Sequence, residues 1–110
     1  MSDHILNNEI VCYITAPNED EALNIARALV ENRLAACANI IKNVRSIYSW
    51  KGAVEDDAEV LMIVKTRKPL FHKLSEKVKE LHSYDVPEVI ALPIIDGSED
   101  YLEWLRESTQ

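Results

Sequence analysis

The spacing of apolar residues predicts where strands and helices alternate along the chain. Residues 10–16 are rich in β-branched and aromatic types and carry apolar side chains on both faces, which predicts a strand in the interior of a sheet. Asn18, followed three residues later by Glu21, is typical of a capping box, and the apolar positions beyond it predict a helix over 19–32. A second apolar stripe at helical spacing predicts another helix over 69–82.

A long hairpin is predicted between these two helices. Residues 34–50 contain no glycine or proline, a turn is expected at 51–53, and a return strand is expected over 58–66, after the acidic run 55–57. At about 3.3 Å per residue, a straight strand as long as the first would span roughly 55 Å, whereas a compact domain of this size is about 35 Å across. Part of the hairpin is therefore expected to bend away from the body or to leave it.

The last two elements complete the topology. Residues 88–95 predict a strand, and Pro93 indicates a sheet edge or a bulge because proline cannot donate to a ladder. Ser98 is placed to cap a short helix over 99–108, whose buried side is expected to contain Tyr101, Leu102, Trp104 and Leu105. The order β-α-β-β-α-β plus a final helix predicts an α+β fold of the ferredoxin-like, split βαβ type, with two helices on one face of an antiparallel sheet.

The other face of that sheet would be uncovered. The return strand is apolar on both sides, and a bare apolar face is improbable for a soluble monomer. Oligomerisation through the sheets is the simplest way to cover it, and the projecting hairpin offers an arm that reaches a neighbour. The interface is expected to be large enough that the monomer is not independently stable.

Charge and composition narrow the class of protein. The 110 residues include 19 acidic and 12 basic side chains, a net charge of −7, so the surface would repel a phosphate backbone and nucleic acid is not an expected partner. No apolar stretch approaches the roughly 20 residues that cross a bilayer, so membrane association is not expected either. Two cysteines and an N-terminal segment with neither a basic start nor an apolar run predict a cytoplasmic protein with reduced thiols.

Several ordered blocks carry a resemblance that spans nearly the whole chain. They are RLAACANI at 33–40, SIYSWKG at 46–52, KT at 65–66, HSYDVPE at 82–88 and YLEW at 101–104. Together they resemble the CutA family of divalent-cation tolerance proteins, so residues 1–110 are expected to form a single CutA-like domain. The resemblance implies a cytoplasmic homotrimer of ferredoxin-like subunits, similar in build to PII-type signalling proteins, with strands pairing between subunits.

The same resemblance implies a link to copper and other divalent metals. Members described as metal-binding look to use a cysteine just before the Thr-Ala-Pro segment and a pair of histidines before the block that begins here at His82. This chain has Ile14 and Leu81 at the cysteine and first histidine positions. The candidate ligands are then Cys37 and His82, with Cys12 as a weaker third, and one subunit is short of the thiolate and imidazole donors that copper prefers.

Each of these three residues also has a plain structural interpretation. Cys12, on a central strand, is favoured as a small core side chain rather than a ligand. Cys37 lies in a run of small residues and could simply pack or line a pocket. His82 could be a helix-terminal histidine that is favoured there by the dipole and binds no metal.

A second candidate site involves charged residues on an otherwise apolar strand. Glu59 and Lys65 share one face of the return strand and need partners if that face is buried. They form either a solvated pair at the rim or, with Arg33, Trp50 and Tyr84, an intersubunit cleft of the kind that PII-like trimers use for small ligands. In the second case the expected effector is a small anionic or zwitterionic molecule.

No nucleophile motif, phosphate-binding glycine loop or paired Cys-x-x-Cys is present, so an enzyme is not expected. The acidic runs are interpreted as solvated surface rather than metal sites. The leading hypothesis is a trimeric divalent-cation tolerance protein that responds to metal ions, with weak or conditional copper binding. The alternatives are a PII-like sensor that binds a small ligand at the intersubunit cleft, and a structural trimeric scaffold.

Overall fold

The computed structural model describes residues 8–110, and its elements follow the predicted order. They are β1 (Glu9–Ala16), α1 (Glu19–Glu31), β2 (Cys37–Trp50), β3 (Ala53–Arg67), the 3₁₀ turn η2 (Lys68–Leu70), α2 (Phe71–Leu81), β4 (Val89–Pro93) and α3 (Glu99–Glu107). The N-terminal segment, on which the expected cytoplasmic location partly depends, lies outside the described residues.

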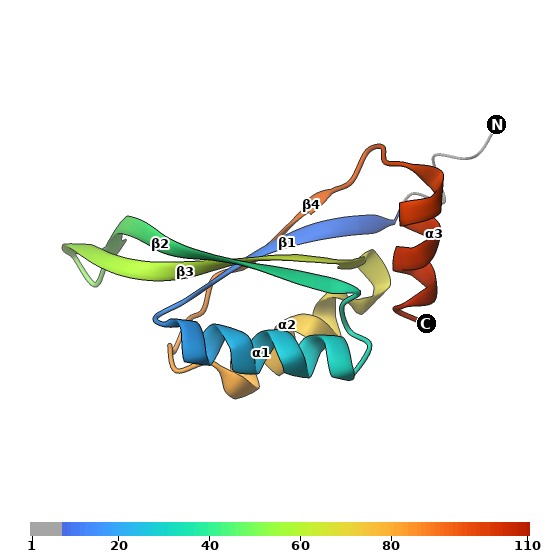
Figure 1. The fold of residues 1–110 in the computed structure, drawn as a ribbon. Helices are drawn as coiled ribbons and strands as arrows, with labels where there is room; N and C mark the ends of the chain where they lie inside the picture. Colours follow the sequence, from blue (N-terminus) through green and yellow to red (C-terminus); the bar gives the residue numbers. More distant parts are fainter. Residues whose placement is uncertain (1–7) are drawn as a thin grey trace.

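The four strands form one antiparallel sheet in the order β2-β3-β1-β4. Helices α1 and α2 lie side by side on one face, whereas α3 stands at the end of the sheet (Figure 1). This is the ferredoxin-like arrangement predicted from the element order. Pro93 is the last residue of β4, which is an edge strand, so the edge position inferred from that proline is also confirmed.

The hydrophobic core lies between the sheet and the two helices. Alternate residues of the central strands point towards the helices and are fully buried, and the apolar stripes of α1 and α2 meet them; the set includes Cys12, Ile14, Met62, Val64, Ile25, Leu29, Leu74 and Val78. The alternate residues of the strands and the apolar stripes of the helices therefore form one hydrophobic layer.

At the start of α1, one of the two hydrogen bonds of the predicted capping box is formed. Asn18 Oδ1 accepts a hydrogen bond from the Glu21 backbone N–H at 2.8 Å, as an N-cap should. The reciprocal contact is replaced by another, because the Glu21 carboxylate accepts from the backbone N–H of Ser83 at 2.9 Å. The chain leaving the end of α2 thus satisfies Glu21, a partner that local sequence cannot reveal.

The hairpin between β2 and β3 is the longest element pair in the structure. Lys51 and Gly52 form its two-residue turn with φ of 50° and 83°, the left-handed conformation that such turns require. The return strand therefore begins at Ala53 and not after the acidic run: residues 55–57 lie within β3, because the tight turn leaves no room for them in a loop.

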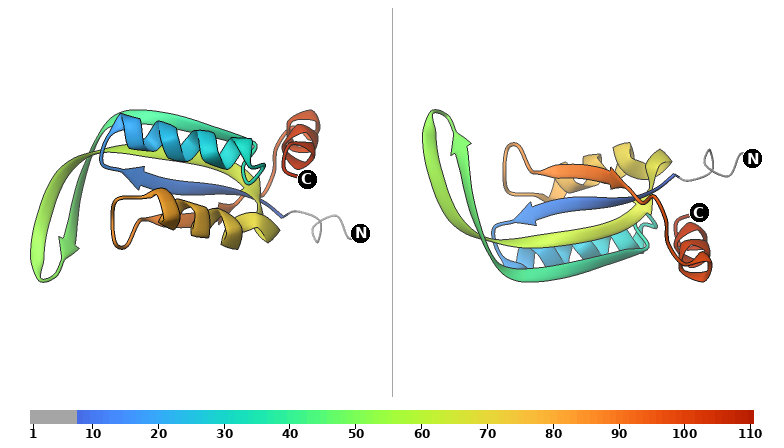
Figure 2. Two further views of the ribbon diagram at one scale, coloured as in Figure 1. Left: turned by 90° about the horizontal axis from the view of Figure 1, so that it is seen from below. Right: turned by 90° about the horizontal axis from the view of Figure 1, so that it is seen from above.

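The hairpin also leaves the body, as its length predicted. The register shifts between Ile41 and Val44, and Asn43 there has a φ of 64°, so the outer half bends away from the sheet (Figure 2). The molecule measures 49 Å along its longest axis against 27 and 23 Å along the others. The outer half of the hairpin forms a projecting, curved arm.

Helix α3 departs from its prediction in one respect. Leu105 is fully buried, but Tyr101 and Trp104 are 42% and 43% exposed, so placing both aromatics on the buried side was wrong. Because α3 crosses the end of the sheet instead of lying flat on a face, it buries only a narrow stripe. The two rings pack on each other with centroids 5.3 Å apart.

The sheet face opposite α1 and α2 is uncovered, as expected, and apolar over much of its area. Register places Val11, Tyr13, Ile41, Leu61, Ile63, Ile90 and Leu92 on it. Ile90 is 51% exposed and Leu92 46% exposed. None of the helices among residues 8–110 is long and apolar enough to span a bilayer.

Candidate functional site

A cleft of about 570 Å³ opens between the hairpin arm, the end of β1 and the loop that follows α2. Ten residues line it: Thr15, Ser46, Ile47, Tyr48, Trp50, Glu59, Tyr84, Asp85, Val86 and Glu88. Its volume lies within the range of small-molecule sites. Three of the ten are aromatic, three are acidic and none is basic, so the cleft has negative potential and polarisable walls.

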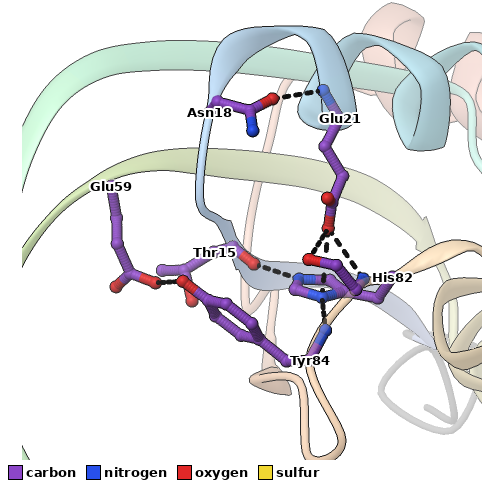
Figure 3. A network of polar contacts seen from close by, with 7 residues as sticks. Thr15, Asn18, Glu21, Glu59, His82 and Tyr84 are labelled. Carbon is purple, nitrogen blue, oxygen red and sulfur yellow. Dashed lines mark hydrogen bonds and ion pairs between the residues drawn. The ribbon is translucent and has the colours of Figure 1, made fainter.

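A hydrogen bond between Tyr84 and Glu59 joins the loop to the sheet. The Tyr84 hydroxyl donates to Glu59 Oε2 at 2.8 Å, and Glu59 is only 7% exposed (Figure 3). Burial, and secondarily this acceptor, raise the pKa of Tyr84 well above its usual value. The phenol therefore stays protonated and acts as the donor that stabilises a buried carboxylate.

A second tyrosine on the arm has a similar partner. The Tyr48 hydroxyl donates to Asp57 Oδ2 at 2.5 Å, which raises the pKa of Tyr48 to about 12. Asp57 belongs to the acidic run that the sequence analysis interpreted as solvated surface, and the structure confirms that Asp57 is exposed. Across the strands from Ser46, Asp57 adds negative charge beside the cleft.

His82 positions the loop that carries Tyr84. Its Nε2 lies 2.7 Å from the carbonyl oxygen of Thr15, which can only accept, so the ring proton is on Nε2. Its Nδ1 accepts from the backbone N–H of Tyr84 at 3.0 Å, and the two rings are 4.7 Å apart. Both ring nitrogens of this buried histidine are thus engaged by the chain itself (Figure 3).

Glu21 completes this network from α1. One oxygen, Oε2, accepts from the N–H and the hydroxyl of Ser83 at 2.9 and 3.0 Å and lies 3.3 Å from His82 Nδ1. Residues 82–84 are therefore held from three sides, by β1, by α1 and by the end of α2. The consequence is a fixed placement of the Tyr84 ring at the mouth of the cleft.

The structure brings together three of the five residues predicted for the small-ligand cleft. Trp50, Glu59 and Tyr84 all line it, but Arg33 and Lys65 do not. Lys65 lies six residues along β3 from Glu59, roughly 20 Å for a strand, and donates to Asn39 Oδ1. Arg33 donates to the carbonyl oxygens of Glu107 and Gln110 at 2.6 and 2.9 Å.

The candidate metal ligands lie apart from one another. Cys12 has no exposed surface, and its burial raises the pKa of the thiol to about 11, so it stays protonated within the core. Cys37 is half-buried at the start of β2, opposite Lys65, whereas His82 contacts the far end of β1 at Thr15. Within residues 8–110, no three Asp, Glu, His or Cys side chains gather closely enough to hold a metal ion.

Sequence reasoning missed several lining residues. Asp85 and Glu88 follow Tyr84 in the sequence, and their negative charge beside this aromatic residue was a signal that could have indicated them. Ser46 and Ile47 gave none, because only the bend in the hairpin turns them towards the loop after α2.

Fold and cleft together define a ferredoxin-like α+β protein with a projecting hairpin arm and an acidic, aromatic cleft at its base. The chain belongs to the family of CutA1 divalent ion tolerance proteins, whose family model matches residues 10–108. It is 55% identical over 101 residues to the divalent-cation tolerance protein CutA of Thermus thermophilus, covering 92% of this chain and 98% of that protein.

Other relatives extend the comparison. Human protein CutA is 47% identical over 109 residues, covering 99% of this chain but 61% of the human protein, so this chain spans about three fifths of that relative. The solved Thermus thermophilus structure superposes with a TM-score of 0.91, covering 93% of this chain and 99% of that one. The structure described as a periplasmic divalent cation tolerance protein CutA from Archaeoglobus fulgidus is 41% identical, with a TM-score of 0.90 and coverages of 93% and 99%. The Thermus thermophilus and Archaeoglobus fulgidus relatives are named as divalent-cation tolerance proteins and not as enzymes.

Proposed function

We propose that this chain contributes to tolerance of divalent cations as a cytoplasmic homotrimer without enzymatic activity. The names of its relatives supply the functional class. The two cysteines are free, which suits a reducing compartment. The observation that supports assembly is the uncovered apolar face of the sheet, since a continuous exposed patch of this kind marks an interaction surface.

The arm strengthens the case for assembly with further copies of the same chain. Ile47 and Val54, on the outer half of the hairpin, are 69% and 78% exposed, so the arm carries apolar side chains far from its own core. An arm that projects from one subunit and an open face on the next form a head-to-tail contact, which closes into a ring when the rotation permits.

The mass in solution tests this assembly. Light scattering at micromolar concentration is expected to give three times the mass of one 12.5 kDa chain. Leu92→Asp, which places a charge on the open face, is expected to lower that mass, whereas Glu76→Asp on the exposed surface of α2 should not. A monomeric wild-type protein would contradict the proposal.

Copper binding is proposed through Cys37, the accessible thiol, with donors from more than one subunit. Two observations favour Cys37 over the other candidate ligands: Cys12 is enclosed by the core, and both nitrogens of His82 already have partners within the chain. A ligand role for His82 requires that it give up its contact with Thr15 or with Tyr84.

A competitive Cu(I) titration of the reduced protein separates these roles. Cys37→Ser is expected to weaken uptake most, His82→Ala should show whether the second predicted ligand takes part, and the exposed His72→Ala serves as the matched control. Uptake that is unchanged in Cys37→Ser would remove the thiol as a ligand and refute the copper proposal.

A second candidate function is that of a small-ligand sensor. The observation that favours it is the cleft itself, which has the volume of a ligand site and a tyrosine fixed at its mouth by the His82 network. Screening metabolites by thermal shift, with Glu59→Gln beside wild type, tests it. A ligand that stabilises both proteins equally would place its binding elsewhere.

A further inference from the structure

The loop between β4 and α3 contains a dipeptide that occurs nowhere else in the chain. Asp96 is followed by Gly97, whereas every other aspartate or asparagine precedes a residue that carries a side chain. The loop lies at the end of the sheet opposite the hairpin arm (Figure 1), and Asp96 and Gly97 are both exposed. Water therefore has access to the bond between these two residues.

The Asp96 carboxylate folds back onto the backbone of the next residue. The Gly97 N–H donates to Asp96 Oδ1 at 2.9 Å, a local contact that aspartate commonly makes in loops. Because Cγ is bonded directly to that oxygen, the contact holds the side-chain carboxyl carbon beside the Gly97 nitrogen. Residues 94–98 belong to no helix or strand, so no ladder of backbone hydrogen bonds opposes closer approach of these two atoms.

Gly97 also lacks the group that would obstruct this approach. Asp85, in the exposed loop after α2, precedes the β-branched Val86, whose side chain crowds the neighbouring backbone nitrogen. At Gly97 a β-carbon would lie 3.2 Å from side-chain atoms of Leu102, so tight packing at the start of α3 favours glycine there. The fold thus keeps, at an exposed position after an aspartate, the residue that leaves its nitrogen most open to attack.

We propose that Asp96 is a site of spontaneous modification, at which the native protein converts aspartate to isoaspartate. The Gly97 nitrogen loses its proton and bonds to Asp96 Cγ, and one carboxyl oxygen leaves as water, which closes a succinimide ring. A water molecule then opens the ring at either carbonyl. Opening at Cγ restores aspartate, whereas opening at the backbone carbonyl routes the chain through the side chain and gives isoaspartate, with no net change in composition.

The modification acts on the start of α3. Isoaspartate adds one methylene group to the backbone just ahead of Ser98, the N-cap residue, whose carbonyl oxygen accepts from the Leu102 backbone N–H at 3.0 Å. Gly97 packs closely against the side chain of the same Leu102, so a longer connection displaces this contact. Conversion is therefore expected to loosen α3 and to lower the midpoint of unfolding.

Water labelled with a heavy oxygen isotope detects the reaction in the assembled protein. Wild type is kept in this water at neutral pH and body temperature for weeks, then digested in ordinary water and analysed by peptide fragmentation in a mass spectrometer. Each passage through the succinimide places one labelled oxygen on Asp96, so label and an isomeric peptide are expected at that residue. Asp85 is the internal control, and its label should stay at background.

A matched pair of variants measures how strongly the position matters. Asp96→Asn keeps the acceptor oxygen and lets the ring close with loss of ammonia, and Asp85→Asn makes the same change before Val86. Asp96→Asn is expected to deamidate about tenfold faster than Asp85→Asn, which corresponds to a barrier lower by about 1.4 kcal/mol. Asp96→Glu, which keeps the charge but needs a six-membered ring, should take up no label.

Comparison with the unfolded chain separates the effect of the fold from that of the dipeptide. Labelling of Asp96 in guanidinium chloride but not in the native protein would overturn the proposal, because the fold would then protect this bond. Equal deamidation of the two asparagine variants would overturn it as well. Urea unfolding of stored protein at one protein concentration tests the consequence: a lower midpoint for wild type than for Asp96→Glu is expected, and equal midpoints after conversion would refute the effect on α3.

Discussion

Charged side chains lie at both ends of the sheet, but their surroundings differ. At one end they bind groups of the chain itself, and at the other they line a cleft. At the C-terminal end, Arg33 and Arg67 donate to carbonyl oxygens at the end of α3, and Arg106 pairs with the buried Glu9 at 3.2 Å. At the hairpin end, Glu59 and Tyr84 face a cleft that is open to solvent. Arg33 lies in one of the blocks that resemble the family, yet it binds carbonyl oxygens of its own chain. A charged residue in such a block is therefore not by itself evidence of a binding site.

The reason lies in what each end leaves unsatisfied. A helix terminus exposes carbonyl groups without partners, and the arginines satisfy those of α3, so the C-terminal end is closed by its own chain. At the hairpin end, the start of α1 and the end of α2 are joined to each other through Glu21, His82 and Ser83, and no basic residue among residues 8–110 lines the cleft beside them. Four predictions test this contrast between a closed end and an open one.

The largest expected effect is loss of the buried contact beneath α3. Leu105→Ala should destabilise the protein by about 3 kcal/mol, since it leaves a cavity at a fully buried position. Urea unfolding at one fixed protein concentration measures it, with the exposed Glu103→Ala on the same helix as control. A loss no larger than that of the control would mean that α3 is not integral to the closed end.

Next in size is the arginine that holds the chain terminus. Arg67 donates to Thr109 Oγ1 at 2.8 Å and to the Thr109 carbonyl at 2.6 Å. Arg67→Ala should cost about 2 kcal/mol, the range for hydrogen bonds to a charged group in a partly buried setting. The same denaturation experiment with the exposed neighbour Lys68→Ala is the comparison, and equal costs would refute a structural role for Arg67.

At the open end, the two tyrosine–carboxylate pairs should differ. Tyr84→Phe removes the donor to a buried carboxylate and should destabilise by about 1 kcal/mol. Tyr48→Phe removes a pair at the surface of the arm and should produce no resolvable change in the unfolding midpoint. The opposite ranking would contradict the placement of Glu59 as the buried partner.

The smallest expected effect is on the pH dependence of stability. Tyr48 and Tyr84 have a raised pKa in the folded state, so their contribution is complete below the ordinary tyrosine value of 10.0 and is lost as the pH rises above it. For Tyr48 the window runs from 10.0 to about 12. Phenolate absorbance should show part of the tyrosine ionisation delayed beyond pH 10.0 in wild type, and the amplitude of this delayed part should be smaller in Tyr48→Phe, which lacks one of the two phenols. Complete ionisation of the native protein near pH 10 would contradict this.

Much of the fold follows from local pattern. The period-two and helical spacing of apolar residues predicted the strands and the helices in their observed order. The length of residues 34–50 was enough to predict that the hairpin leaves the body. The error at Tyr101 and Trp104 has a physical reason: an amphipathic stripe predicts burial but not whether a helix lies flat on a sheet or crosses its end. The acidic run was misplaced because a two-residue turn needs only Lys51 and Gly52.

The candidate site was less predictable. Arg33, Trp50, Lys65 and Tyr84 all lie in the family-like blocks, and Glu59 was added to them as a charged residue on an otherwise apolar strand. The actual partners of Arg33 and Lys65, the end of α3 and Asn39, are set by long-range packing. His82 was expected as a metal ligand, a role that stays a prediction, while its tautomer and its contacts with Thr15 and Tyr84 come only from the structure.

What the sequence by itself determined is the element order, the ferredoxin-like topology and the family, because these depend on the periodicity and order of residues along the chain. What only the tertiary structure decided is which polar groups meet. The bend at Asn43 turns the arm towards the loop after α2 and so forms the cleft, whereas Arg33 donates to the carbonyl oxygens of Glu107 and Gln110 beyond the far end of α1. Those contacts join residues far apart in sequence, where no local pattern specifies a partner.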